Sequence, residues 1–176
     1  MDSHLERELL DWYAQFTIPA DRKIENWSYS WFKKVETSEI DFYEKKFGFV
    51  LPELYREFLI KIGEGRLASD KLGGETIHYA NTFMGPKRIS EIVSKRSKEW
   101  EVYPDFIASD DLPFFDLGNQ SVLVFNRREF AKGTVYYPSR LYKIASTFNE
   151  FLSRLSIDIT FYIDEIIGAQ ELKSRK

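Results

Sequence analysis

Residues 40–65 read IDFYEKKFGFVLPELYREFLIKIGEG and decide the fold of this chain, because they specify two short helices joined by a tight turn. Ile40, Tyr43 and Phe47 recur at positions i, i+3 and i+7, which places them on one face of a helix that Gly48 ends. Pro52 suits the start of the next helix, where a missing N–H costs nothing. The second helix runs to Gly63 and carries apolar residues at helical spacing: Leu51, Leu54, Tyr55, Phe58, Leu59 and Ile62.

Helical patterns also mark both ends of the chain. A capping box of Ser3 and Glu6 opens a predicted helix over residues 3–16. A second capping box, Thr147 and Glu150, opens a helix near the C-terminus, and residues 157–167 continue as a final helix. The second capped helix turns four apolar residues inward: Phe148, Phe151, Leu152 and Leu155.

The segment 23–36 fits two periods. Trp27, Trp31 and Val35 form an i, i+4, i+8 helical face, whereas Trp27, Tyr29 and Trp31 alternate as in a strand. Both interpretations stay open, and we favour the helix.

The middle of the chain changes from loop and helix to short β runs. Residues 64–85 are rich in Gly, Asn and Ser and indicate a loop with a short strand at 76–79, and residues 90–100 indicate a charged helix. The β runs fall at residues 106–107, 114–115, 122–125, 134–137 and 141–144. Such close spacing favours antiparallel neighbours. The predicted fold class is α+β, with a single mostly antiparallel sheet of about five or six strands packed with helices.

Composition narrows the class of protein. The 176 residues suit one domain, and 43% hydrophobic and 16% aromatic content indicates a substantial core. The absence of cysteine excludes disulfides and thiolate chemistry and suits a reducing cytoplasm. A formal net charge of −3 argues against nucleic acid as a partner. The charged start of the sequence is not a secretory signal, and no apolar run is long enough for a membrane span, so we expect a soluble cytoplasmic protein.

Four groups of residues follow one another along the chain. The first consists of Ile40, Glu44, Gly48, Leu51, Pro52, Tyr55, Phe58, Leu59 and Gly63. The second is 115–118 (FDLG) with 122–126 (VLVFN), the third is 133–137 (GTVYY), and the fourth is 146–152 (STFNEFL).

In this order the four groups resemble the SUKH superfamily, which includes fungal cell-wall glucan-synthesis regulators and bacterial immunity proteins. Asn119 departs from the second glycine that is frequent in the family. The resemblance covers residues 37–156 and implies a SUKH-like core there, with 1–36 as an N-terminal helical extension packed on it and 157–176 as a C-terminal helix and tail.

The inventory of reactive side chains indicates neither an enzyme nor a metal or cofactor site. His4 and His78 are the two histidines, and neither belongs to a metal-binding or nucleophile motif. Two glycine-rich pieces, 63–66 and 73–75, lack the Lys-Ser/Thr pair of a phosphate loop and each contains an acid. We therefore expect no catalytic residues and no cofactor.

Acidic and aromatic side chains are the candidates for binding a protein partner. Asp105, Asp110, Asp111 and Asp116 lie close together in sequence, with Asp110 and Asp111 at an expected loop tip. They are either turn-favouring residues of a solvated loop or an acidic patch that meets a basic partner. Glu64 extends such a patch if its loop folds nearby. Tyr136 and Tyr137 are either core residues or a partly exposed aromatic anchor.

The resemblance implies a non-enzymatic binding module. We expect an immunity protein that binds and neutralises a cognate toxin with a basic domain, such as a nuclease. We expect it to be a monomer or weak dimer. The partner-binding candidates are Asp110, Asp111, Asp116, Glu64, Tyr136 and Tyr137. The alternative is an intracellular regulatory or scaffolding domain related to the cell-wall glucan-synthesis regulators.

Overall fold

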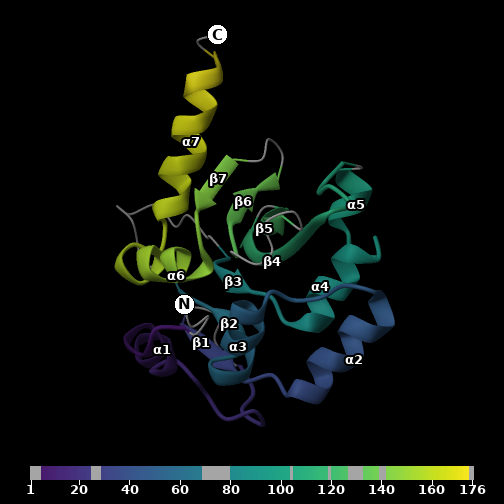
Figure 1. Ribbon diagram of the computed structural model, residues 1–176, viewed down its shortest axis with the longest axis vertical. Coiled ribbons are helices and arrows are strands. Elements are labelled where there is room, and N and C mark those ends of the chain that lie inside the picture. The colour runs from purple at the N-terminus through teal and green to yellow at the C-terminus, as the bar shows by residue number, and fades with distance from the viewer. Residues whose placement is uncertain are drawn as a thin grey trace.

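The computed structural model describes residues 5–24, 29–68, 80–103, 105–118, 120–126, 133–138 and 142–174, with the side chains of the last helix described up to Ile167. Over these ranges seven antiparallel strands form one sheet in the sequential order β1 to β7, together with seven helices (Figure 1). This confirms the predicted α+β class, with more strands than expected. The strands are β1 Trp31–Lys33, β2 Glu64–Arg66, β3 Thr82–Phe83, β4 Asp111–Gly118, β5 Ser121–Asn126, β6 Val135–Tyr137 and β7 Tyr142–Ala145. The helices are α1 Arg7–Ala14, α2 Thr37–Phe47, α3 Glu53–Lys61, α4 Pro86–Val93, α5 Glu99–Val102, α6 Phe148–Ile157 and α7 Phe161–Ser174.

The helix pair α2–α3 forms as its sequence predicted. Gly48 ends α2 with a left-handed φ of 69°, and Pro52 precedes the first turn of α3. Glu44 stabilises the turn between α2 and α3, because its carboxylate accepts hydrogen bonds from the Leu51 N–H at 2.7 Å and from the Arg56 guanidinium at 2.7 Å. Arg56 also pairs with Asp41.

The helix favoured for residues 23–36 is wrong at its C-terminal end, which forms strand β1. Phe32 is fully buried, whereas Trp31 and Lys33 are half-buried, so the period of two prevails here. Residues 25–28, including Trp27, lie outside the described residues. The pairing partner of β1 is β2, which falls in the segment expected to be a loop, and tertiary pairing therefore decided both elements.

Other boundaries also differ from the predicted ones. Helix α1 begins at Arg7, and Ser3 lies outside the described residues. The helix expected over 90–100 is two helices, because Lys95 adopts a left-handed φ of 58° between α4 and α5. Residues 106–107 are buried but form a bend, and the strand expected at 76–79 lies outside the described residues.

The core is built from aromatic rings on one face of the sheet. Phe32, Phe83 and Phe115 stand side by side in a fully buried row across β1, β3 and β4. Tyr55 of α3 lies at the centre, in ring contact with Phe114, Phe125 and Phe148. Rings from α1, α3 and α6 therefore cover this face.

Helix α6 has the predicted capping box and the predicted inward face. The Thr147 hydroxyl accepts the N–H of Glu150 at 3.0 Å, and the Glu150 carboxylate accepts the N–H of Ser146 at 2.7 Å. The four apolar side chains predicted to point inward are all buried. Arg154 then connects α6 to the sheet edge, donating to the Ile144 carbonyl at 3.0 Å and pairing with Glu165 of α7.

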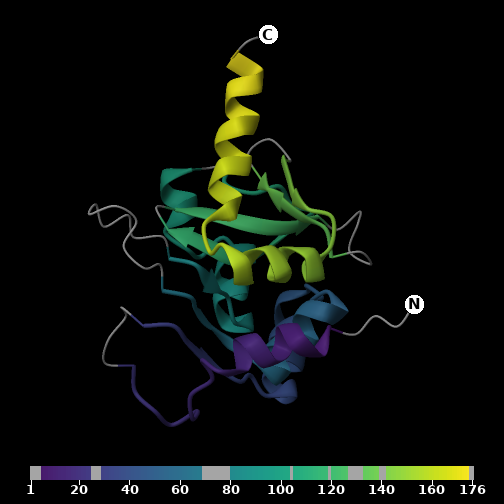
Figure 2. The ribbon, with the colours of Figure 1, turned by 90° about the vertical axis from the view of Figure 1, so that its left-hand side faces the viewer.

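Helix α7 stands away from the body of the molecule. Figure 2 shows it rising past the sheet while α6 lies flat beneath the strands. Its first turn is packed, since Phe161 and Tyr162 are buried, whereas Ile167 is half exposed. No helix in the described part of the chain is long and apolar enough to cross a membrane.

Candidate functional site

The face of the sheet opposite the aromatic core carries a row of partly exposed polar side chains. Strand pairing aligns five residues across β1 to β5: Trp31, Arg66, Thr82, Asp116 and Val122. Because side chains alternate along a strand, this row points away from the buried row that contains Phe83 and Phe115. Apart from the buried Val122, its members are half-buried and accessible.

Asp116 is the acidic residue of this row. Its carboxylate accepts the N–H of Gly118 at 2.8 Å. Burial raises the pKa of the Asp116 carboxyl above its ordinary value, and the nearby Glu99 raises it further, while Gly118 and Arg88 act in the opposite direction. Asp116 thus belongs to a charged group with Arg88 of α4 and Glu99 of α5.

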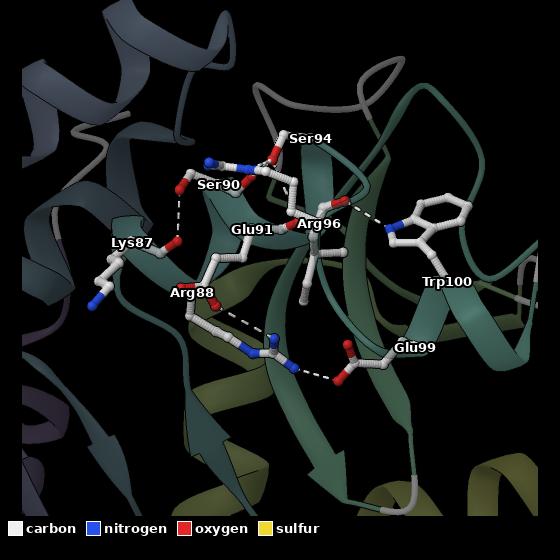
Figure 3. A network of polar contacts seen from close by, with 9 residues as sticks. Lys87, Arg88, Ser90, Glu91, Ser94, Arg96, Glu99 and Trp100 are labelled. Carbon is white, nitrogen blue, oxygen red and sulfur yellow. Dashed lines mark hydrogen bonds and ion pairs between the residues drawn. The ribbon is translucent and has the colours of Figure 1, made fainter.

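Figure 3 shows the polar network around Arg88 and Glu99 at the corner between α4 and α5. Arg88 pairs with Glu99 and lies 3.7 Å from the carboxylate of Glu91. The indole N–H of Trp100 donates to the Ile92 carbonyl at 2.8 Å. Burial raises the pKa of Glu99, but hydrogen bonds from its own backbone N–H and from Arg88 outweigh that cost and leave its pKa below the ordinary value. Two side-chain contacts, Arg88 with Glu99 and Trp100 with the Ile92 carbonyl, therefore connect the single turn of α5 to α4.

The segment that follows α5 lines a hollow of about 250 Å³ together with strands β5 and β6. Tyr103 is half exposed, at 51% of its surface, and Asp105 is exposed. Val122 lines the same hollow and pairs directly with Asp116, so the hollow and the polar row are continuous. The hollow is lined by Tyr103, Asp105, Phe106, Ser121, Val122 and Tyr137, among others.

The structure places the predicted site residues in four different locations. Asp116 and Tyr137 lie beside and in the hollow. Asp110 and Asp111 lie at the opposite end of β4, five or more residues away, which at strand spacing is roughly 17 Å. Asp111 is 2% exposed and its carboxylate accepts from Asn126 at 3.1 Å and from the Ala108 N–H at 3.3 Å.

Glu64 and Tyr136 complete the set. The Glu64 carboxylate accepts the N–H of Gly85 at the start of α4, and burial, with a smaller effect of Glu39, raises its pKa. Tyr136 is half-buried and pairs with Val124 and Lys143. The structure thus gives Asp111 and Glu64 defined hydrogen-bond partners within the fold. Partner binding by the six predicted residues stays a prediction.

Several residues of the site were not predicted, among them Tyr103, Arg66 and Arg88. Tyr103 carries no periodic signal that separates an exposed aromatic residue from a core one, and Arg66 lay in an expected loop. Arg66 is also unusual because burial lowers its pKa and no carboxylate of the described residues forms an ion pair with it. Arg88 could be recognised only once α4 and α5 were seen to meet. The described ranges contain no group of three or more His, Cys, Asp or Glu that could hold a metal ion.

Asp116→Asn is expected to change how stability depends on pH. The folded-state pKa of Asp116 is raised, so between its ordinary pKa of 3.8 and that raised value the native state binds more protons than the unfolded state. The free energy of unfolding of the wild type should therefore fall, relative to Asp116→Asn, as the pH rises through this window. Urea unfolding at a series of pH values measures the difference.

Asp11→Asn is the matched control for this experiment, because Asp11 is exposed on α1. It removes the same formal charge at an exposed position on another element and so controls for the loss of one charge. A wild-type free energy of unfolding that does not fall relative to that of Asp116→Asn as the pH rises would contradict the assignment of a raised pKa to Asp116.

Comparison with known proteins finds similarity over most of the chain. The sequence model of the SMI1 / KNR4 family (SUKH-1) matches residues 34–154. Immunity protein YxxD of Bacillus subtilis (strain 168) is 24% identical over 138 residues, which cover 76% of this chain and 88% of that protein. The family match starts just before α2 and ends within α6, so strands β2 to β7 and the whole hollow lie inside it.

Proposed function

The chain belongs to the SMI1 / KNR4 family (SUKH-1), as its motifs predicted, and on that premise we propose that it is an immunity protein that binds and neutralises a protein toxin. The observation that carries the proposal is the similarity to a protein named as an immunity protein, extending over 76% of this chain. To neutralise a toxin, an immunity protein needs only to form a tight complex that covers the toxin's active site. Binding without catalysis is therefore the proposed mode of action.

The surface around the hollow supports a basic partner. Asp105 is exposed at the hollow and Asp116 adjoins it, while the chain as a whole carries a formal charge of −3. Carboxylates on such a surface attract a domain that itself binds anions, as a nuclease does, and accelerate the encounter of the two proteins. Tyr103 and Tyr137 supply aromatic contact area of the kind enriched at interface centres. We propose that toxins with a basic catalytic domain are the partner class.

A capture experiment with a functional readout tests the proposal. The tagged protein is used to capture partners from its source cells, and the terminal domain of each stoichiometric partner is then expressed under an inducible promoter in bacteria with and without this chain. We expect growth arrest by the partner alone, rescue by co-expression, and a one-to-one complex whose association rate falls about tenfold or more between low and high salt.

Two results would contradict the proposal. A partner that forms the complex but never arrests growth is not a toxin, and several endogenous partners would indicate a regulatory scaffold. A toxic partner that co-expression fails to rescue would show that binding does not neutralise it.

A further inference from the structure

We propose that the hollow formed by Tyr103, Asp105, Phe106, Ser121, Val122 and Tyr137 binds a single cationic side chain, arginine or lysine, presented by a protein partner. The inference rests on the proposed function for the identity of the partner. The chemistry of the hollow, however, is argued from its own residues and can be tested without any partner.

Size favours a side chain over a cofactor. Pockets for small molecules usually measure roughly 300–1,000 Å³ and enclose most of their ligand. This hollow measures about 250 Å³ and opens to the surface beside the exposed Tyr103 and Asp105. Such a shape suits one inserted side chain of a larger molecule, which is how an interface anchor fills a pocket.

The lining selects for positive charge. Tyrosine rings attract a cation placed over their faces, and Tyr103 and Tyr137 both line the hollow. Asp105 lies in the same lining, and none of the described lining residues is a lysine or arginine. A guanidinium or ammonium group would thus meet two tyrosine side chains and one acidic side chain, whereas an acidic group would be repelled.

A neighbouring hollow shows by contrast why the charge matters. A second hollow of about 180 Å³ lies between α7 and the sheet and shares Tyr137 with the first. Its other described lining is mainly aliphatic, with Leu117, Ile163 and Ile166, and contains no carboxylate. Tyr137 and Ser121 line both hollows, whereas the carboxylate residue Asp105 lines only the first.

The walls of the cation hollow are held in place before any partner arrives. Phe106 is buried and contacts the ring of Trp100 at 5.9 Å between centroids, and Trp100 is itself bonded to the Ile92 carbonyl. The opposite wall is β5 paired to β6. Because these groups are already ordered, binding would cost little conformational entropy, which is a property of productive anchor sites.

The first test uses small probes and NMR. The ¹⁵N-labelled protein is titrated with N-acetyl-arginine methylamide and, as an uncharged control of similar length, N-acetyl-norleucine methylamide. We expect saturable shifts of the amides of Tyr103, Asp105, Ser121 and Tyr137 with the arginine probe only. Asp105→Asn should weaken that binding by about fivefold to tenfold, whereas Asp11→Asn on the distant α1 should not change it. Equal shifts with norleucine, or none with arginine, would overturn the inference.

The second test separates this inference from the proposed function. With a captured toxin, Asp105→Asn and Tyr103→Ala should each raise the dissociation constant by about tenfold, with the same melting temperature as the wild type. Rescue and affinity that are unchanged in both variants would overturn the cation site and leave the immunity function standing. Arginine binding by NMR without any toxic partner would leave the site standing and remove the function.

Discussion

Gly63→Ala is expected to lower the free energy of unfolding by about 3–5 kcal/mol, the largest effect we predict for a change of one carbon atom. Gly63 connects α3 to β2 and has a φ of 123°, a region that side chains rarely adopt. An alanine Cβ at this position would lie 1.9 Å from the Lys33 carbonyl oxygen and 2.6 Å from the Lys34 nitrogen. Both atoms are backbone, so relief requires β1 to move away from β2. Urea unfolding monitored by tryptophan fluorescence measures the loss.

Gly48→Ala is the matched control, because Gly48 also has a positive φ, 69°, but no atom lies within 4 Å of the position of its added Cβ. The control should cost about 1–2 kcal/mol, which is the conformational penalty alone. Equal losses in the two variants would show that the close approach of β1 to Gly63 does not contribute. The comparison thus distinguishes the free-energy cost of the positive φ from the cost of the clash between the new Cβ and the backbone of Lys33 and Lys34.

Tyr55→Ala is expected to cost about 4 kcal/mol or to prevent folding. Tyr55 has no exposed surface, and its ring contacts rings of α3, β4, β5 and α6. Its hydroxyl lies 2.7 Å from the Met84 carbonyl oxygen and 3.0 Å from that of Phe114. Burial, with a smaller contribution from Glu64, raises the pKa of the hydroxyl well above its ordinary value, so it stays protonated and can donate.

Tyr55→Phe divides this loss into its parts. The phenylalanine keeps the ring contacts and removes only the hydrogen bond, which should cost about 1–2 kcal/mol. Thermal and urea unfolding of the two variants give the two values. A phenylalanine variant as unstable as the alanine variant would mean that the hydroxyl, and not ring packing, carries most of the stabilisation.

Local chemistry was the part of the fold that could be predicted. Gly48, Pro52 and the Thr147–Glu150 capping box act within one or two turns of their own helix, so reading a few neighbouring residues was enough to place α2, α3 and α6. The strands β5 to β7 were found for a similar reason, since each is short and bounded by turn residues. Of β4 only residues 114–115 were predicted, whereas the strand extends over Asp111–Gly118.

The missed strands share one cause, which is pairing between distant segments. β1 and β2 are three residues each, too short for a period to show, and they exist because Trp31 to Lys33 meet Glu64 to Arg66 across the sheet. Such pairing is not visible in a window of local sequence.

The expected helix over 90–100 failed for a different reason. Lys95 breaks it with a left-handed backbone, a conformation that residues other than glycine rarely adopt, and its side chain lies 4.8 Å from the ring of Trp100.

The candidate site was predicted in part. Asp116 and Tyr137 were named from their residue types and lie at the hollow, whereas Asp110 and Asp111, next to them in the predicted patch, lie at the far end of β4. An eight-residue strand is long enough to separate acids that are neighbours in sequence. Closeness along the chain was therefore a poor guide to closeness on the surface.

The family, the α+β class, the central helix pair and the capping of α6 could all be predicted from the sequence, because they depend on residue types at short, fixed spacing. The strands β1 to β3 and the hollow, in contrast, follow from tertiary contacts. The hollow draws on residues 103–106, 121–122 and 137, which come together only when the α5 segment lies against β5 and β6. Hydrogen bonds within a helix are closed by residues a few positions apart, whereas a sheet and its surface are made by residues whose separation along the chain carries no local signal.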